Sequence, residues 1–351
     1  MAPNALQLSQ KLRISQAAAE LYLASCVVDL HVESYSFYRS LGYDFRKRHG
    51  RGLNQALLFG QADLPRFKEA AIAGATWAIT ANPLRPEADR AETFAHQLDE
   101  LTALLEEKGE ARVVSNAEQF AEARAAGKHA AFIGVQGANA LPLDLTFLEQ
   151  IRGRVLRITL MHMSDSAWGK TSAPSLRRGT LGLTSHGLDL VEAMNALRIG
   201  VDLAHIHPQG FWDAVRVHRP DLPLLVTHTG VSGVHSHWRN LDDAQLRAVA
   251  QSGGVVGIMY HALYMGDPLL GGRVSTVARH IQHAVQVMGE DHVALGSDWD
   301  GLICTPRDMP TCLELPRLVH ALLQLKMAES AIEKILGLNF LRVVKLLRDH
   351  S

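Results

Sequence analysis

Short apolar runs recur along the chain, and most are followed by a stretch with the spacing of an amphipathic helix. The runs cover residues 26–32, 74–82, 130–137, 155–162, 199–206, 223–229, 254–260 and 292–300. They are nearly continuous rather than alternating, which is typical of strands buried on both faces of a parallel sheet. Helix-like segments such as 91–109, 187–200 and 242–254 lie between them. Eight strands alternating with helices predict an α/β fold, the (β/α)₈ TIM barrel.

A doubly wound open sheet is the alternative fold. It is disfavoured because no glycine-rich phosphate loop follows the first run. No low-complexity linker or charge block divides the chain. We therefore expect one barrel domain over residues 1–351, with an N-terminal helical extension and further helices at the C-terminal end.

Polar residues stand where the apolar runs end. They are His31, Glu33, Gln136, His162, His205, His228 and Asp298. In a barrel, the C-terminal ends of the strands meet at one rim, where the active sites of this fold are built. A single histidine at a strand end is more often a hydrogen-bonded core residue. Several polar residues that all stand at the C-terminal ends of their runs favour a functional site.

Imidazoles and carboxylates are the usual zinc ligands of hydrolytic sites, which makes a metal centre the first hypothesis. His31 and Glu33 are two residues apart and share a face of their strand. His205 and His228 end two neighbouring runs. A zinc ion held there would polarise a carbonyl group and lower the pKa of a bound water toward ~7.

Three more residues complete the predicted chemistry. Asp298 is expected to accept the proton of the water, and His162 to stabilise the oxyanion. Arg239, in the stretch "HWRN", is a candidate clamp for a substrate carboxylate. Weaker candidates for contact with substrate are His207, His235, His237 and His261, and Trp168 is a candidate pocket wall.

The amino-acid composition limits the kinds of partner and the cellular compartment that we expect. Lys and Arg number 35 against 36 Asp and Glu, so no charge excess points to nucleic acid or an anionic membrane. No apolar stretch approaches the ~18 residues of a membrane-spanning helix, and the first residues lack a secretory signal. The 3 cysteines cannot form a disulfide framework. We expect a cytoplasmic protein.

Several motifs together resemble those of a known family, the renal or membrane dipeptidases. These zinc metallopeptidases belong to the amidohydrolase superfamily. The resemblance covers nearly the whole chain and includes the stretches "VVDLHVE", "IGVQGAN", "LRITLMH", "GVDLAHI", "THTGVSGVHSHWRNL" and "LGSDWDG". It implies a (β/α)₈ barrel with two zinc ions that cleaves dipeptides, sometimes with a D-residue at the C-terminal position.

The resemblance also implies a role for each matching residue. His31 would ligate one zinc ion, and His205 with His228 the other. The implied substrate contacts are, in chain order, His162, Arg239, Tyr264 and Asp298. His162 would meet the scissile carbonyl, Arg239 the dipeptide carboxylate and Asp298 the free amine. Tyr264 would make a weaker contact.

Two positions depart from the family pattern, and both concern the metals. Glu33 stands where the family has aspartate, and Gln136 where it has the glutamate that bridges both zinc ions. Two divalent ions ~3.5–4 Å apart repel, and a bridging carboxylate offsets that repulsion. A glutamine offers only a neutral oxygen. Three outcomes therefore remain, which are one zinc ion, two weakly held ions or none, and we expect one ion rather than two.

If one ion binds, the pair His205 and His228 is favoured, with His31 and Glu33 as the alternative pair. Gln136 faces the space between them.

Three functions fit these residues. The first is a hydrolase that cleaves a dipeptide or similar small amide by metal-activated water. The second is a catalytically silent homologue that binds a peptide-like ligand or a protein partner. The third is an enzyme repurposed to tailor a peptide-derived metabolite. A homodimer is possible, as in some relatives, although nothing in the sequence marks an interface.

Overall fold

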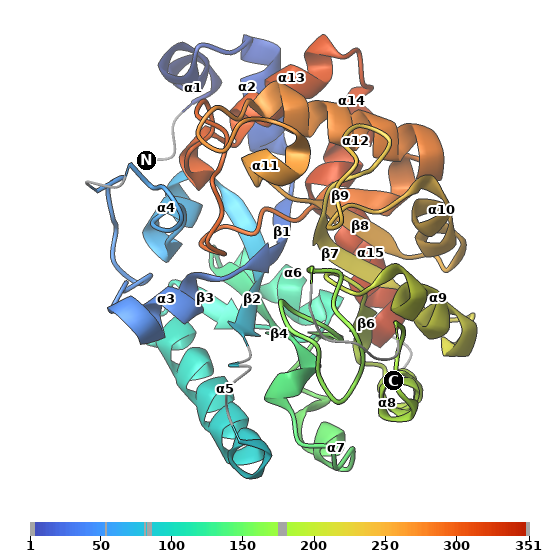
Figure 1. Ribbon diagram of the computed structural model, residues 1–351. Coiled ribbons are helices and arrows are strands. Elements are labelled where there is room, and N and C mark those ends of the chain that lie inside the picture. The colour runs from blue at the N-terminus through green and yellow to red at the C-terminus, as the bar shows by residue number, and fades with distance from the viewer. Residues whose placement is uncertain (1–3, 53–54, 81, 83–85, 175–180, 349–351) are drawn as a thin grey trace.

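Eight parallel strands form a closed ring with helices packed around it (Figure 1). The computed structural model describes residues 4–52, 55–80, 82, 86–174 and 181–348. The ring strands are β1 (Val27–Val32), β2 (Ile72–Thr80), β4 (His129–Gln136), β5 (Arg157–Thr159), β6 (Gly200–Asp202), β7 (Leu225–Thr229), β8 (Val255–Ile258) and β9 (Val293–Leu295). Pairing of β2 with β4 and of β9 with β1 completes the ring. The predicted (β/α)₈ barrel is confirmed, and the doubly wound alternative is wrong.

Each apolar run of the sequence overlaps one ring strand. Residue 81, within the second run, lies outside the described residues. One strand was not predicted. β3 (Ala111–Val113) pairs with the first residues of β4, so it lies beside the ring rather than in it. Its three residues sit in a polar stretch and carry too little pattern to be recognised.

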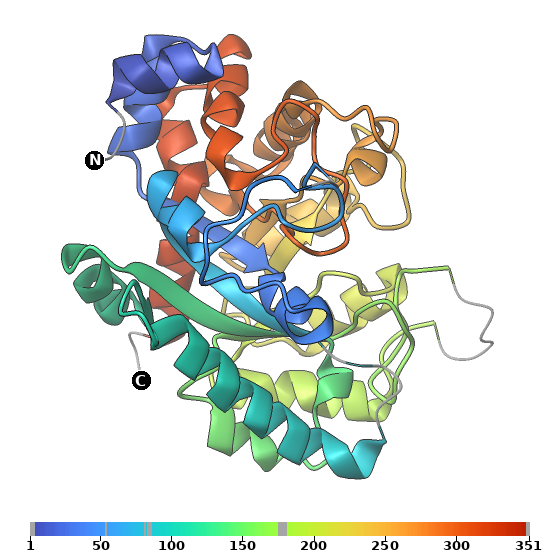
Figure 2. The same ribbon diagram turned by 90° about the vertical axis from the view of Figure 1, so that its left-hand side faces the viewer.

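The helices follow the strands as the barrel requires. They are α1 (Ala5–Leu12), α2 (Gln16–Ala24), α3 (Ser34–Leu41), α4 (Leu64–Glu69), α5 (Arg90–Glu106), α6 (Ala117–Ala125), α7 (Phe147–Ile151), α8 (Ser185–Ala196), α9 (Pro208–Val217), α10 (Asp243–Gln251), α11 (Ala262–Met265), α12 (Val274–Met288), α13 (Pro316–Gln324), α14 (Glu329–Glu333) and α15 (Asn339–Arg348). The helix-like segments of the sequence overlap α5 and α8 and contain α10. The N-terminal helix α2 packs on α13 from the far end of the chain (Figure 2).

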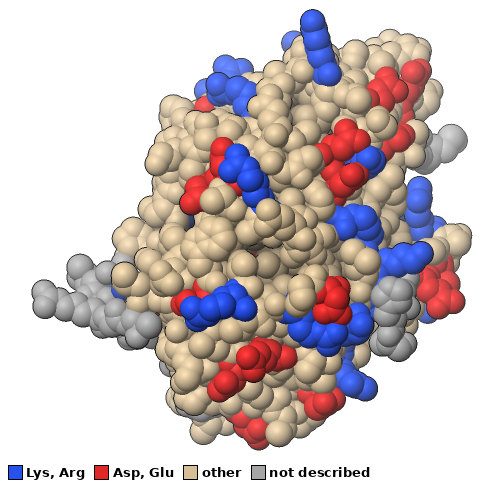
Figure 3. Space-filling view, turned by 90° about the vertical axis from the view of Figure 1, so that its right-hand side faces the viewer, with Lys and Arg blue, Asp and Glu red and all other residues tan. Residues whose placement is uncertain are grey.

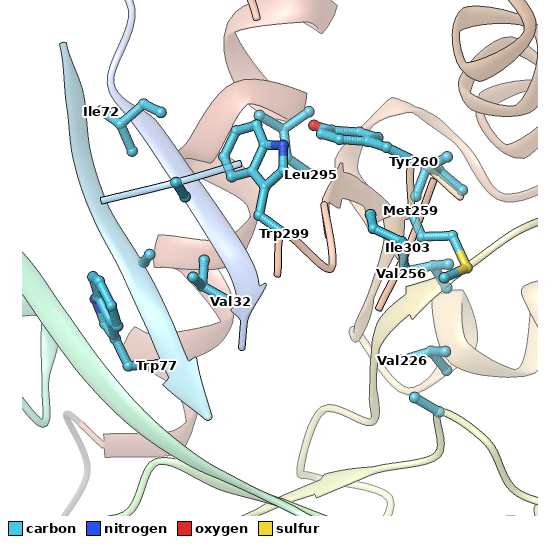
Figure 4. Packing of buried hydrophobic residues seen from close by; sticks show 14 of the residues in the cluster. Val32, Ile72, Trp77, Val226, Val256, Met259, Tyr260, Leu295, Trp299 and Ile303 are labelled. Atoms are coloured by element: carbon cyan, nitrogen blue, oxygen red, sulfur yellow. The ribbon is translucent and has the colours of Figure 1, made fainter. Parts of the chain in front are cut away.

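Two apolar clusters hold the barrel together. The larger one lies between the strands and the surrounding helices and includes Trp77, Met259 and Trp299 (Figure 4). The smaller one joins residues at or near the N-terminal ends of strands, such as Leu225 and Val255, to α15. The last helix therefore covers the N-terminal end of the barrel, and the C-terminal end remains open for a site.

The ring closes between its first and last strands. β1 pairs with β9 through Asp29 and Leu295. The buried Asp29 carboxylate accepts hydrogen bonds from the backbone N–H of His31 at 2.9 Å and of Ser297 at 3.2 Å. One side chain thus links the two strands at the seam.

The described residues include no helix that is long and apolar enough to cross a membrane. On the face drawn in Figure 3, basic and acidic side chains are interspersed rather than gathered by sign.

Candidate functional site

The predicted site residues lie at the C-terminal ends of the ring strands and in the loops that follow. His31 is within β1, His228 within β7, and Gln136 is the last residue of β4. The loops directly after β1, β5, β6 and β9 carry, respectively, Glu33, His162, His205 and Asp298. Arg239 lies in the loop between β7 and α10, and Tyr264 is in α11.

A pocket of about 320 Å³ opens at this end of the barrel. Six of the predicted residues line it: Glu33, Gln136, His162, His205, Tyr264 and Asp298. His31 and His228 lie behind the lining, where their rings stack with centroids 4.0 Å apart. Arg239 is buried and donates from Nη2 to the backbone oxygen of His228 at 2.7 Å. The structure therefore brings the nine residues together at one end of the barrel.

The histidines of this cluster are held neutral. Burial lowers the pKa of His205 and of His228 well below the usual range, and the nearby Arg239 guanidinium adds to the effect. Burial also lowers the pKa of His162 to about 4. A neutral imidazole has one nitrogen with a lone pair, so each ring can ligate a metal or accept a proton.

Hydrogen bonds fix which nitrogen of His228 carries the proton. Thr227 Oγ1 donates its hydrogen to Asp202 Oδ2 at 2.7 Å. The same hydroxyl oxygen lies 3.0 Å from His228 Nδ1, so it accepts a hydrogen bond from Nδ1–H. His228 Nε2 therefore keeps its lone pair and accepts a hydrogen bond from His205 Nε2–H at 2.8 Å. A bound metal ion would replace this hydrogen bond. The contact with Thr227 matches the outer hydrogen bonds that orient metal-binding histidines.

His31 has the opposite arrangement. Arg157, a fully buried residue of β5, places Nη2 at 2.5 Å from His31 Nδ1. A guanidinium can only donate, so Nδ1 is the acceptor and the neutral ring carries its proton on Nε2. That nitrogen lies 3.1 Å from Glu33 Oε1 and 3.6 Å from Asp298 Oδ1. Gly134 makes room for the arginine, since a Cβ there would lie 2.6 Å from Arg157 Nε.

Asp202 connects the two arrangements from below the pocket. Its Oδ2 accepts from Thr159 Oγ1 at 2.6 Å and lies 3.3 Å from Arg157 Nη1. Its Oδ1 accepts from two backbone N–H groups, those of Ala204 at 3.1 Å and Thr227 at 3.0 Å. A buried cation is thereby paired with a buried anion that is itself hydrogen-bonded, as such pairs require.

Two hydroxyl groups hold the Glu33 carboxylate. Its Oε2 accepts from Ser36 Oγ at 2.7 Å and from Thr80 Oγ1. Burial by itself would raise the pKa of Glu33, but the contacts with His31 and Thr80 together outweigh it, and the pKa is lowered. Glu33 is therefore an anion at neutral pH. The longer side chain still reaches the edge of the pocket.

Asp298 is the second carboxylate, and its environment is different. Burial raises its pKa well above the usual range, and the neighbouring Glu33 charge adds to the shift. Its backbone is left-handed, with φ of 62°. Two carboxylates whose pKa values are pushed apart are a common feature of acid–base sites.

The acceptor atoms of the pocket supply a test for a metal. Gln136 Oε1 and Asp298 Oδ1 are buried and have no hydrogen-bond partner within the described chain, and Glu33 Oε1 has only the 3.1 Å approach of His31 Nε2. Ligand atoms of His31, His228 and Asp298 also lie within 4.8 Å of one another. Unsatisfied buried oxygen atoms are costly, and a cation among them removes that cost. The donor set fits a metal ion.

The weaker candidates from the sequence differ in whether they line the pocket. His261 lines the pocket, whereas His207, His235 and His237 are not among its lining residues. Trp168 is also absent from the lining, since it is buried and donates from Nε1 to the backbone oxygen of Ala138 at 3.0 Å.

Sequence reasoning missed the supporting residues Arg157, Asp202 and Thr227. A signal was present, because each is a polar residue inside an apolar run. In a strand buried on both faces, such a residue needs a partner.

Comparison with known proteins decides the family. A family model described as membrane dipeptidase, peptidase family M19, matches residues 15–350. The chain belongs to the membrane dipeptidase family. The resemblance inferred from the sequence motifs is thereby confirmed.

Two curated relatives of this dipeptidase-family chain match it over part of its length. An uncharacterized protein of Klebsiella pneumoniae, encoded in the pqqA 5′ region, is 40% identical over 171 residues, which are 47% of this chain and 60% of that protein. An uncharacterized dipeptidase of Schizosaccharomyces pombe is 32% identical over 226 residues, which are 62% of this chain and 53% of that protein. The matched segments thus span little more than half of either relative.

A solved structure matches over nearly its full length. It is a metallopeptidase from Rhodobacter sphaeroides, liganded with a phosphinate mimic of the dipeptide L-Ala-D-Ala. It is 25% identical, has a TM-score of 0.81, and the match covers 92% of this chain and 99% of that chain. The barrel of this family member therefore agrees with that of a dipeptidase-family metallopeptidase.

Proposed function

We propose that the chain is a dipeptidase that hydrolyses the amide bond of a dipeptide or a similar small amide with the help of one zinc ion. The observation that carries the proposal is the set of buried, unpartnered acceptor atoms beside neutral histidines at the base of a pocket. Family membership supports the reaction class, and the phosphinate ligand of the Rhodobacter enzyme supports a dipeptide as substrate.

His205 and His228 are the residues we assign to the zinc ion, with Gln136 Oε1 as a neutral oxygen donor. The Thr227 hydroxyl leaves His228 Nε2 with a free lone pair, which a metal ligand needs. His31 instead presents N–H toward Glu33, because Arg157 occupies its other nitrogen. When bound, zinc supplies a Lewis acid for the carbonyl oxygen and a water of lowered pKa.

A single ion follows from the charges at the centre of the site. Gln136 brings no charge to the position between the two histidine pairs, and the Arg157 guanidinium adds a positive charge beside His31. A second divalent ion at the His31 end would meet both effects, and the Glu33 carboxylate would offset them only in part. Repulsion between like charges is strong where water is excluded.

The remaining residues take roles that their environments support. Asp298 would accept the proton of the water, since its raised pKa suits a general base better than an ordinary carboxylate. Neutral His162 would donate N–H to the developing oxyanion. Tyr264 would supply a further contact with substrate.

Arg239 would bind the substrate carboxylate. Burial lowers its pKa to about 10, so it keeps its charge at neutral pH. Its Nε is buried without a partner in the described chain and can donate to an incoming anion.

The test is a turnover assay on protein titrated with zinc. We expect hydrolysis of L-Ala-L-Ala and L-Ala-D-Ala, and at least tenfold weaker kcat/KM for L-Ala-L-Ala amide because Arg239 loses its anionic partner. In Arg239→Met, with melting temperature as the folding control, the two substrates should converge. Absence of hydrolysis at every zinc concentration would overturn the proposal.

The second candidate is the silent homologue, and one observation favours it. Gln136 replaces the charge that the family pattern places between two metals. The same assay separates the candidates, because a silent homologue binds the dipeptides in calorimetry without cleaving them.

A further inference from the structure

Four apolar residues line the pocket from one side of the barrel. Phe37 comes from α3 after β1, Leu302 and Ile303 from the loop after β9, and Met259 follows β8. These three strands are neighbours in the ring. The polar lining residues Gln136, His162 and His205 come from strands on the other side. Polar residues such as Glu33, Asp298 and Tyr264 line the pocket on the same side as the apolar residues, which therefore form a group within a mixed lining.

Leu302 is unusual among these apolar residues. Its side chain is 62% exposed, so it contributes little to the core. Its backbone is left-handed, with φ of 60°, a conformation that leucine seldom adopts. Asp298 and Asp300 in the same loop are left-handed as well, with φ of 62° and 63°. Strain of this kind persists where surrounding contacts enforce it, often at functional sites.

Gln61 enforces the conformation of this loop. Its side-chain Oε1 accepts from the backbone N–H of Asp300 at 2.8 Å, and its Nε2 donates to the Ile303 oxygen at 2.8 Å. The backbone N–H of Gln61 donates to Asp300 Oδ1 at 2.7 Å. Gln61 is fully buried. The position of Leu302 at the pocket mouth is therefore fixed by contacts on both sides of it in the chain.

We propose that Phe37, Leu302 and Ile303 form a subsite for an apolar side chain on the N-terminal residue of a dipeptide. The subsite shares its loop with Asp298, to which the family resemblance assigns the free amine of that residue. This inference rests on the proposed function, because it needs a dipeptide oriented by Asp298 and Arg239. It predicts a preference for leucine-like over glycine N-terminal residues.

Leu302→Asn is the variant that tests the subsite. Asparagine has nearly the same branched shape, tolerates a left-handed backbone and removes the apolar surface. Leu58→Asn is the matched control. Leu58 is also left-handed, with φ of 70°, is 39% exposed and bridges to Ile303, but it does not line the pocket.

Binding of L-Leu-L-Ala and Gly-L-Ala to zinc-free protein would be measured by calorimetry, and turnover of both on zinc-loaded protein. We expect wild type to favour the leucine dipeptide about tenfold, the scale at which apolar pockets discriminate side chains. Leu302→Asn should reduce that ratio to below about threefold, and Leu58→Asn should leave it unchanged.

Each outcome separates the two proposals. Equal affinity of wild type for both dipeptides, or a preference that survives Leu302→Asn, would overturn the subsite. A preference that depends on Leu302 without turnover of either dipeptide would uphold the subsite and overturn the hydrolase.

Discussion

The two ends of the candidate site contain the same residue type in different surroundings. At the β7 end, the hydroxyl of Thr227 accepts from His228 Nδ1–H and leaves Nε2 with its lone pair. At the β1 end, the guanidinium of Arg157 donates to His31 Nδ1 and leaves the proton on Nε2. The groups behind the rings therefore decide which histidine is ready to bind a metal.

Asp202 makes the comparison stricter, because it contacts both supports. The same carboxylate oxygen accepts from Thr227 and lies beside Arg157. Thr227 stands between His228 and the Asp202 carboxylate, and Arg157 stands between His31 and the same carboxylate. The two histidines therefore differ because of the residue in between. A ligand set read from histidine positions alone misses this difference.

The largest expected effect comes from replacing His228 and His31 one at a time. We expect His228→Gln to weaken zinc binding by about two orders of magnitude, and His31→Gln by about tenfold or less, since outer groups contribute on that scale. Zinc titration against a competing chelator measures both. Equal losses, or a larger loss in His31→Gln, would assign the metal to the β1 end.

Gln136→Glu tests whether the missing charge separates one ion from two. The substitution restores an anion between the two ends with almost no change of volume. We expect zinc affinity to rise by tens of fold and bound zinc to move from one toward two equivalents per chain, by elemental analysis after dialysis. No gain in bound zinc would mean that Gln136 is not at the metal position.

Thr227→Val tests the support of His228 directly. The variant keeps the shape of the side chain and removes the oxygen that accepts from Nδ1–H. We expect zinc affinity to fall about tenfold, as for other outer hydrogen bonds of metal-binding histidines. Thr229→Val, in the same strand, is the control, because the Thr229 hydroxyl bonds only backbone oxygens, those of Gly230 and Arg239, in the described structure. Similar losses in both variants would point to strand damage.

The smallest effect concerns pH and the loop after β7. Buried His280 accepts from the backbone N–H of Val231 at 3.0 Å and donates to the Met265 oxygen at 3.1 Å, so it is neutral. Burial lowers its pKa to about 4. The unfolded chain binds a proton below ~6.5, so this stability is present above ~6.5 and is lost as pH falls toward 4.

His280→Gln can keep both hydrogen bonds without titrating. We expect metal-free wild type to lose about 1 kcal/mol more stability than this variant between pH 7 and 5.5, by denaturant unfolding. Parallel pH profiles for the two proteins would contradict this.

The sequence predicts the barrel and the rim because both follow from local pattern. Strands buried on both faces leave continuous apolar runs, and parallel strands bring their last residues to one edge. His31, Gln136 and His228 could therefore be placed before any coordinates existed.

The contacts across the barrel could not be predicted in this way. The approach of Arg157 to His31 joins β5 to β1, which are not neighbours in the ring, and it depends on the absence of a side chain at Gly134. The left-handed backbone at residue 302 could not be predicted either, because the residue there is leucine and not glycine. Such features arise from packing in three dimensions rather than from the period of a strand or helix.

The seam between β1 and β9 has a consequence for the order of folding. Asp29 and Leu295 are separated by most of the chain, yet their pairing closes the ring. His31 lies two residues after one of them, and Asp298 three residues after the other. The pocket therefore does not exist in any partly folded state in which these strands are apart, and a newly made chain assembles it only after the last ring strand has been synthesised.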